Sequence, residues 1–555
     1  MGRSFPGLKP GTAGTGGGAG GRPGTGGLLP WVLALPPLGA VFCFFVLPYL
    51  AALALPGFGG GRAGLPPSLV PVTLFTLKQA LLSTLLALLL GLPGAWFGFF
   101  RRRLRALLGI PFALPPILVV LAFVLFLGNS GWLGRFQAFL GGPPLRVLYR
   151  PLAVVLAHGF YNAPIVIRLA GDGIAQARRH WSQAAASLGA APAGAAFTVI
   201  LPLAAPSVLA SALLVFLYSF TSFAVVLVLG GGPAATTLAV EIYRAARISV
   251  NYRAAGILAL VETLIALGAF LGWGLLDRAL TRRRDPGTGE ALPEAPFREG
   301  FAGSLIGGIY AAVLLILVIL PILSVVLQSF MLRPGLPLRF SLQPWLGIAG
   351  RVIPALGRSL LLAGASASLA CLIAVAAAGS LRLAGERSLP GTLVRVFSVS
   401  PLISSGVVLG LGWLLLYGRG SLSLASLAAF HAVLSLPFAF NSVLQGFRDI
   451  PANTANVALS AGASPLTRLL TVDLPLALQR LRSAWAFSAA ISLGELNALL
   501  MLGPESFETL PLLIYRAASS YRYGSACAAG TLLILCCAAA FLLAETRSGG
   551  SPRGA

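Results

Sequence analysis

Long apolar runs separated by short polar loops occupy nearly the whole chain. Twelve runs are long enough to cross about 30 Å of hydrocarbon as helices, near residues 28–55, 74–100, 106–128, 151–170, 201–231, 253–277, 302–330, 355–380, 390–416, 423–443, 474–503 and 523–543. Proline interrupts some of them, for example at Pro111, Pro115 and Pro116. The pattern predicts an all-α polytopic membrane protein with about 12 transmembrane helices.

Polar segments divide this pattern into two halves. Residues 1–28 are rich in glycine and bury little, so we expect a disordered tail. The charged, proline-containing segment 281–300 is a natural linker between a first repeat at 29–280 and a second repeat at 301–545. Residues 546–555 form a second short tail.

The two halves are copies of one another. A shift of 273 positions places His158 on His431, Pro164 on Pro437, Gly189 on Gly462, Pro202 on Pro475 and Gly230 on Gly503, and a shift of 272 superimposes the two "IYRAA" segments at 242–246 and 514–518. Such self-similarity indicates a duplication. Because each copy has an even number of runs, both have the same orientation, as parallel six-helix repeats related by an axis along the membrane normal.

Composition and charge narrow the class further. The chain of 555 residues is 57% hydrophobic and 10% charged, with a mean hydropathy of +0.89, which excludes an ordinary soluble protein. The net charge of +24 does not indicate nucleic-acid binding, because the arginines form short clusters between apolar runs. The five cysteines and three histidines lack the spacing of a metal site, so no metal is expected.

The arginine clusters predict the orientation in the membrane. The densest ones, at 101–105 and 282–284, are separated by four predicted spans, so both can face the cytoplasm as the positive-inside rule requires. Both termini then lie in the cytoplasm. The bias is imperfect, because Arg146, Arg150, Arg244 and Arg247 fall in loops that this topology places outside.

The loop between the fourth and fifth runs of each copy has an unusual composition. It reads "QAAASLGAAPAGAAFTVILP" at 183–202 and "NVALSAGASPLTRLLTVDLP" at 456–475. Alanine and serine leave a slim surface that another protein can approach. Gly189 and Gly462 permit a turn with positive φ, and Pro202 and Pro475 suit the start of the next helix. We therefore predict a short helix, a turn and a second helix beside the membrane.

Both loops resemble the coupling-loop motif of the membrane subunits of bacterial ABC importers, in which an alanine pair is followed by glycine, nine residues and an aliphatic-x-Leu-Pro. The matching residues are Gln183, Ala184, Ala185, Gly189, Leu201 and Pro202 in the first copy and Asn456, Ala458, Gly462, Leu474 and Pro475 in the second. The family usually has glutamate where Gln183 and Asn456 stand, and Val457 replaces the first alanine of the second copy.

This resemblance implies a type I ABC importer permease whose loops dock on a cytoplasmic ABC ATPase, with two ATPase copies expected. The chain has no G-x-x-x-x-G-K-[ST] segment to cradle phosphates, so it is not expected to be an enzyme or to bind a cofactor itself. ATP and Mg²⁺ would bind the separate ATPase.

The segments 218–246 and 491–522 resemble the double-length permeases for thiamine and, less closely, those for ferric iron. The resemblance implies import of thiamine or its phosphates across a bacterial inner membrane, with an extracytoplasmic solute-binding protein as the second partner. A ferric iron importer remains an alternative. A secondary transporter driven by an ion gradient is an alternative of another class, since such proteins also use parallel six-span halves.

Thiamine is a cation with aromatic rings, so its path could use an acid and aromatic faces. Glu262 and Glu495 are acids inside predicted spans, where such residues are costly and become functional candidates. Glu495 falls opposite Ser222 of the first copy, although a purely structural role in holding helices together is an equal alternative. Arg244 and Arg516 of the "IYRAA" segments are candidates for docking the binding protein. His158 and His431 are expected to be packing residues.

Overall fold

The computed structural model describes residues 28–54, 65–97, 114–128, 131–142, 147–230, 232, 235–281, 301–332, 339–385, 387–418, 423–502 and 507–545. Within these ranges the chain is helical, apart from loops and one isolated antiparallel bridge between Met331 and Phe340. The all-α prediction is confirmed. The predicted tails at 1–27 and 546–555, most of the linker, and the arginine clusters at 101–105 and 282–284 lie outside the described residues.

The first copy runs from α1 to α12. Its elements are α1 (Leu29–Val41), η1 (Phe42–Val46), α2 (Leu47–Ala54), α3 (Leu69–Phe97), α5 (Pro116–Leu127), α6 (Trp132–Phe139), α7 (Pro151–Ser187), α8 (Pro192–Ala195), η3 (Ala196–Ile200), α9 (Leu201–Phe220), α10 (Ala224–Leu229), α11 (Leu238–Tyr243), η5 (Arg244–Ile248) and α12 (Tyr252–Thr281).

The second copy runs from α13 to α25. Its elements are α13 (Phe301–Gln328), α14 (Gln343–Leu346), α15 (Ala349–Ala384), α16 (Leu389–Val399), η6 (Ser400–Ile403), α17 (Gly406–Tyr417), α18 (Leu424–Arg448), α19 (Ala452–Ser460), α20 (Pro465–Arg468), η8 (Leu469–Asp473), α21 (Leu474–Leu476), α22 (Leu478–Gly494), α23 (Asn497–Leu502), α24 (Leu510–Ser519) and α25 (Tyr523–Glu545).

Ten helical segments among the described residues are long and apolar enough to cross a membrane, or up to eleven if the bent pair α16 and α17 forms one span. About twelve were predicted. The predicted run at 474–503 is divided instead, because α22 has only 17 residues and carries Arg480 and Arg482 near its start, and the chain leaves the helix at Glu495. The pair α16 and α17 bends by 103° around the segment that contains Pro401.

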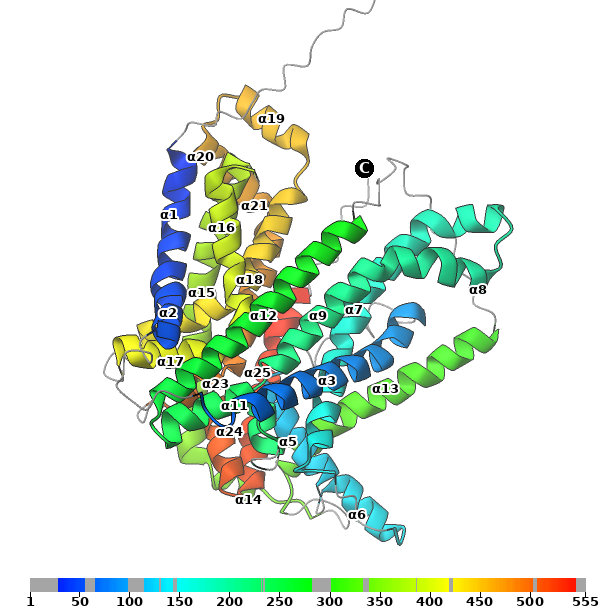
Figure 1. Ribbon diagram of the computed structural model, residues 1–555, viewed down its shortest axis with the longest axis vertical. Coiled ribbons are helices and arrows are strands. Elements are labelled where there is room, and N and C mark those ends of the chain that lie inside the picture. Colours follow the sequence, from blue (N-terminus) through cyan, green and yellow to red (C-terminus); the bar gives the residue numbers. More distant parts are fainter. Residues whose placement is uncertain are drawn as a thin grey trace, which may run out of the picture.

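The first helix of each copy packs against the other copy. The helix α1 contacts α15 and α16, and α13 contacts α5 and α3. Three side chains of the second copy donate to carbonyl oxygens of α1 and η1, at 2.8 Å from Ser380 to Pro30, 3.1 Å from Trp413 to Phe44 and 2.7 Å from Tyr417 to Cys43. In return, the Tyr310 hydroxyl of α13 donates to the Leu90 carbonyl of α3. The two copies are therefore interlocked (Figure 1).

Equivalent contacts recur in the two copies. The Thr76 hydroxyl of α3 accepts a hydrogen bond from the Leu238 N–H at 3.0 Å, and the Ser359 hydroxyl of α15 accepts one from the Leu510 N–H at 2.8 Å. Leu238 and Leu510 begin the helices that carry the two "IYRAA" segments. The duplication inferred from the sequence is therefore also visible in the packing.

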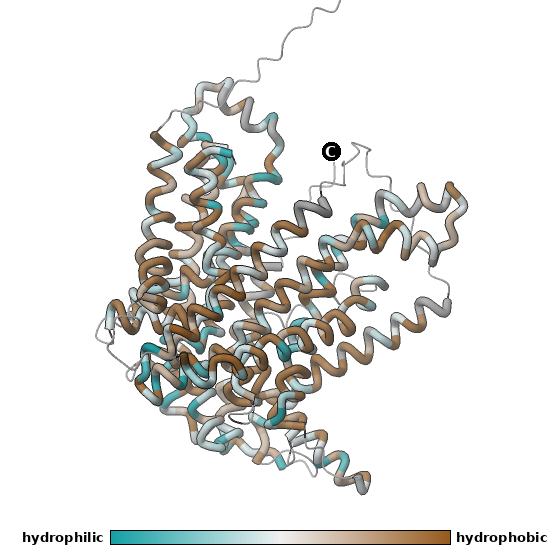
Figure 2. The backbone as a smooth tube through the Cα atoms, viewed as in Figure 1, coloured by the Kyte–Doolittle hydropathy of each residue, from teal (hydrophilic) through white to brown (hydrophobic). Residues whose placement is uncertain are grey.

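The outer surface of the helices is apolar. Figure 2 shows hydrophobic residues along the lengths of the long helices and hydrophilic residues mainly at their ends. On α3 and α12, for example, leucine side chains are more than half exposed at Leu85, Leu89, Leu264, Leu271 and Leu275. A continuous exposed apolar surface of this kind would make a soluble protein aggregate, whereas lipid tails cover it in a membrane.

Candidate functional site

The two predicted coupling loops turn at their glycines in the same way. Gly189 has φ +80° and Gly462 has φ +78°, so the predicted positive φ is confirmed at both positions. After each glycine, the next N–H bonds to a carbonyl five residues back, from Ala190 to Ala185 at 3.0 Å and from Ala463 to Ala458 at 3.1 Å. This pattern is the Schellman motif, in which glycine ends a helix because it adopts the left-handed conformation without strain.

The helices around each turn differ in part from the prediction. In the first copy the motif residues Gln183, Ala184 and Ala185 do not form a separate helix, because α7 continues through them as one helix of 37 residues. In the second copy Asn456 and Ala458 lie on the separate short helix α19. The side chains of Gln183 and Asn456 are outside the described part of the chain.

Each loop then joins the next helix through a π-helical segment. The segments η3 and η8 occupy matching positions, and the α-helices that follow begin at Leu201 and Leu474, with Pro202 and Pro475 in their first turn. Proline has no N–H to donate, and the wider π turn accommodates the missing bond without breaking the helix. The predicted helix starts are confirmed, and η3 and η8 run directly into α9 and the short helix α21.

Exposed apolar side chains gather on these loops. Leu188 is 88% exposed and Phe197 72% exposed in the first, and Val457 is 69% exposed in the second. Leu188 follows the end of α7, Phe197 lies in η3 and Val457 lies on the short helix α19. Exposed apolar side chains on such short connecting elements are suited to contact with a protein partner. In Figure 1, α19 lies at the top of the molecule and α8 at its right-hand side, so the two loops are well separated.

An ion-pair cluster holds the second loop. Asp473 of η8 is fully buried, and its carboxylate lies 3.0 Å from Arg468 of α20 and 3.6 Å from Arg382 of α15. The matching residue of the first copy is Ile200, which is also buried. The second loop is thus joined to α15 by charge, and the first is held by apolar packing.

A cavity of about 480 Å³ lies between the two copies. Both Ser222 and Glu495 line it, as expected for matching positions of the two repeats, and aromatic side chains surround them, including Tyr161, Tyr218, Phe270, Trp273, Phe438 and Phe487. Among the described residues that line the cavity, Glu495 is the one acid, and none is a lysine or arginine. An organic cation with aromatic rings suits this environment.

Glu495 and Glu262 have different surroundings. Glu495 ends α22, and its Oε1 accepts a hydrogen bond from the Ala498 N–H at the start of α23, at 3.0 Å. The Glu495 carboxylate therefore both caps the start of α23 and lines the cavity. Glu262 of α12 is 2% exposed and does not line the cavity, and the Ser405 side chain lies beside its carboxylate.

The two matching histidines are both buried but bonded differently. His158 lies 2.8 Å from the Ser222 hydroxyl through Nε2 and 3.2 Å from Gln79 Oε1 through Nδ1. His431 lies 2.8 Å from Ser492 through Nδ1, and its Nε2 has no partner in the part of the chain that the structure describes. Sequence reasoning missed Gln79, whose signal is an uncharged polar residue inside an apolar run.

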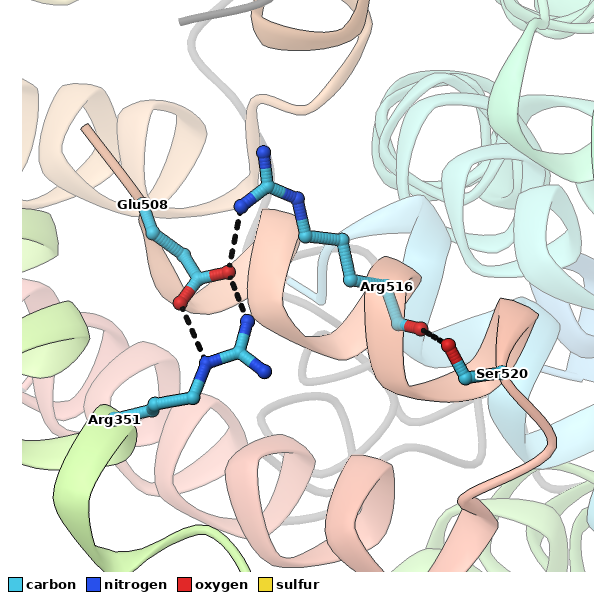
Figure 3. Close-up of polar contacts among 4 residues, drawn as sticks. All are labelled: Arg351, Glu508, Arg516 and Ser520. Atoms are coloured by element: carbon cyan, nitrogen blue, oxygen red, sulfur yellow. Dashed lines mark hydrogen bonds and ion pairs between the residues drawn. The ribbon is translucent and has the colours of Figure 1, made fainter. Parts of the chain in front are cut away.

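The helices α11 and α24, to which the "IYRAA" segments belong, lie in the lower part of Figure 1, away from α8 and α19. Arg516 of α24 and Arg351 of α15 both contact Glu508, at 2.9 and 2.6 Å, while the Arg516 carbonyl accepts from Ser520 (Figure 3). Partial burial would raise the pKa of Glu508, but the two arginines hold it below its ordinary value. Arg244 lies 3.8 Å from Glu241 in the first copy.

Known proteins are similar to this chain along most of its length. Residues 83–285 match the model of the family described as binding-protein-dependent transport system inner membrane components. The thiamine transport system permease proteins of Brucella abortus and Escherichia coli are 29% and 28% identical to this chain, over 89% and 86% of it and 91% and 89% of their own lengths. A putative 2-aminoethylphosphonate transport system permease protein of Salmonella typhimurium is 35% identical over 38% of this chain and 83% of its own length.

Proposed function

The chain belongs to the family of binding-protein-dependent transport system inner membrane components, and we propose that it moves thiamine into the cell. It is a multi-pass inner membrane permease, and its relatives are transport permease subunits rather than enzymes. The observation that carries the substrate proposal is the similarity to thiamine permeases over nearly nine tenths of the chain.

The cavity chemistry supports the same substrate. Thiamine carries a fixed positive charge and two aromatic rings, and the cavity offers one carboxylate, Glu495, among aromatic side chains. A phosphonate or another anion would find no arginine or lysine there. The cavity therefore favours thiamine over the substrate named for the Salmonella relative.

The energy for transport comes, in this proposal, from a separate ABC ATPase that docks on the loops around Gly189 and Gly462. Their exposed apolar side chains and their direct connection to α9 and α21 support this role. Two loops would engage two ATPase copies, each carrying ATP and Mg²⁺. The loops and both termini then face the cytoplasm, and the solute-binding protein docks on the opposite end, near Arg244 and Arg516.

The test is uptake of labelled thiamine, with labelled ferric iron in parallel, in cells from which the gene has been deleted and then restored. We expect only thiamine uptake to be lost and regained, and we expect it to survive an uncoupler while ATP is maintained. Restored iron uptake instead would replace thiamine with the alternative substrate. Collapse of uptake with the uncoupler would indicate a secondary transporter.

A further inference from the structure

The cavity wall of the first copy contains a chain of hydrogen bonds whose direction can be deduced. Gln79 Nε2 lies 2.6 Å from the Ser219 carbonyl oxygen, which can only accept, so the amide nitrogen must face it. The amide oxygen of Gln79 then faces His158 Nδ1 at 3.2 Å. Because that oxygen can only accept, His158 must carry its proton on Nδ1.

The direction of the next bond follows. A neutral histidine with its proton on Nδ1 has an acceptor at Nε2, and His158 is 2% exposed in an apolar setting without a carboxylate partner. The Ser222 hydroxyl, 2.8 Å from Nε2, therefore donates its proton to the histidine. Its lone pairs are left free, and Ser222 lines the cavity, so the hydroxyl can present only an acceptor to a bound solute.

The second copy does not contain the same series of hydrogen bonds, but it presents a hydrogen-bond acceptor at the same place. Leu362 stands on α15 where Gln79 stands on α3, as the matching Thr76 and Ser359 contacts show. Glu495 stands where Ser222 stands, and His431 turns to Ser492 instead. A carboxylate is an acceptor without any support from a neighbour. The two matching positions therefore both present acceptors to one cavity.

Two other lining residues have polar atoms without partners among the described residues. Asn162, one turn after His158 on α7, donates to Ser219 through Nδ2, and its Oδ1 accepts from no group. The indole N–H of Trp273, on α12, is an unpartnered donor. Both atoms are buried in the wall rather than exposed to the cavity, so the acceptors that the two repeats present to a solute are Ser222 and Glu495.

From this arrangement we propose that Ser222 determines specificity, and that His158 and Gln79 position it, so that the cavity selects organic cations bearing an N–H donor. The inference rests on the proposed function and deepens it: the group recognised on thiamine is the amino group of its pyrimidine ring. A solute with a carbonyl at that place would bring its oxygen next to the Ser222 oxygen. Both atoms are acceptors, so no hydrogen bond forms and a buried polar group is left unpaired.

The test compares thiamine with oxythiamine, which has a ring carbonyl in place of the amino group. Both are measured by competition against labelled thiamine on the purified full chain in lipid nanodiscs, with no binding protein present. We expect the wild-type chain to prefer thiamine by about tenfold or more, because the carbonyl of oxythiamine leaves a buried polar group unpaired. The ratio of the two affinities does not depend on how much of the protein is active.

Four variants assign the effect. Ser222→Ala should bring the ratio close to one, and Ser222→Thr, which retains the hydroxyl, should restore it. Gln79→Leu, which copies the second repeat, should lower the ratio because the histidine proton is no longer held on Nδ1. Ser83→Ala is the matched control, because Ser83 is a fully buried residue of the same helix outside this network.

The outcomes separate the two proposals. A wild-type chain that binds thiamine but does not prefer it overturns this inference alone, as does an unchanged ratio in Ser222→Ala. An unchanged ratio in Gln79→Leu removes the positioning role of Gln79 and His158. If Gln79→Leu does not fold, the Ser222 pair decides whether the proposal stands. A folded wild-type chain that binds neither compound overturns both this inference and the thiamine substrate.

Discussion

Glu495 illustrates how one side chain can serve structure and binding together. Glu495 is the residue at which α22 ends, and its carboxylate accepts a hydrogen bond from the Ala498 N–H in the first turn of α23. It is also the one acid among the described residues that line the cavity. Glutamine has the same shape and retains an acceptor for that N–H, but it lacks the charge. The two roles can therefore be separated by substitution.

We expect Glu495→Gln to raise the KM for thiamine uptake by about tenfold or more while the amount of inserted protein stays normal, since a charge-assisted contact is worth about 1.5–3 kcal/mol. Glu495→Ala should lower both uptake and thermal stability, because it also removes the cap of α23. Uptake kinetics and melting in detergent check the pair. Normal KM in Glu495→Gln would show that the charge does not contact the solute.

At the scale of elements, the second coupling loop depends on charges that the first does not have. Asp473 is buried between Arg468 and Arg382, whereas Asp449 and Arg480, which lie 2.8 Å apart, are both about half exposed. Removing one partner of a buried ion pair leaves uncompensated charge in the interior. The exposed pair is screened by water and contributes little.

Asp473→Asn should therefore cost about 3–5 kcal/mol of stability, while the matched control Asp449→Asn should cost roughly 1 kcal/mol or less. Thermal unfolding of the two purified variants in the same detergent gives the comparison. Equal melting temperatures for the two variants would contradict the anchoring of this loop to α15.

The contact of Glu508 with Arg351 and Arg516 predicts that the stability of the fold depends on pH. A carboxyl whose pKa is lower in the folded state than in the unfolded state stabilises the fold at every pH above its unfolded pKa, near 4.5. That contribution is lost as the pH falls through the lowered folded pKa.

Glu508→Gln should consequently melt at a lower temperature than the wild type at pH 7, and the difference should shrink as the pH falls below about 4.5. Melting curves at pH 7, 5 and 3.5 test this sign. A difference that grows on acidification would mean that the carboxyl is not stabilised by the arginines.

Local and repeated features were predictable from the sequence, and long-range ones were not. The glycine turns follow from conformational freedom at Gly189 and Gly462, and the duplication from matching residues such as His158 and His431. The charged cluster at Asp473 and the bond from Gln79 to Ser219 join segments far apart in the chain, which periodicity cannot pair. The sequence could not distinguish Glu262 from Glu495, since both are acids inside apolar runs. Only the packing of the helices decides that Glu495 lines the cavity and Glu262 does not.

At the scale of the whole molecule, the two copies hold each other together. The helices α1 and α13 are exchanged, so that each copy contributes its first helix to the surface of the other. Each copy therefore needs the first helix of the other copy to cover part of its helix surface. These contacts are made by helices on either side of residues 282–300, so two polypeptides divided there would retain them.

Two polypeptides divided at this linker should therefore assemble when expressed together, and each alone should be degraded. Co-purification through a tag on the first half, and accumulation of each half by immunoblot, measure this. Stable accumulation of either half without its partner would contradict the interlocked packing.

In the proposed mechanism, the two glycine turns couple ATP hydrolysis by a separate ATPase to the movement of thiamine. The most direct measurement is labelled thiamine uptake by cells carrying the double variant Gly189→Val and Gly462→Val, beside Gly194→Val, whose glycine has open space and no positive φ. We predict that the double variant inserts normally but loses uptake, since valine resists φ near +80°, and that the Gly194 variant retains it. Full uptake in the inserted double variant would contradict the account.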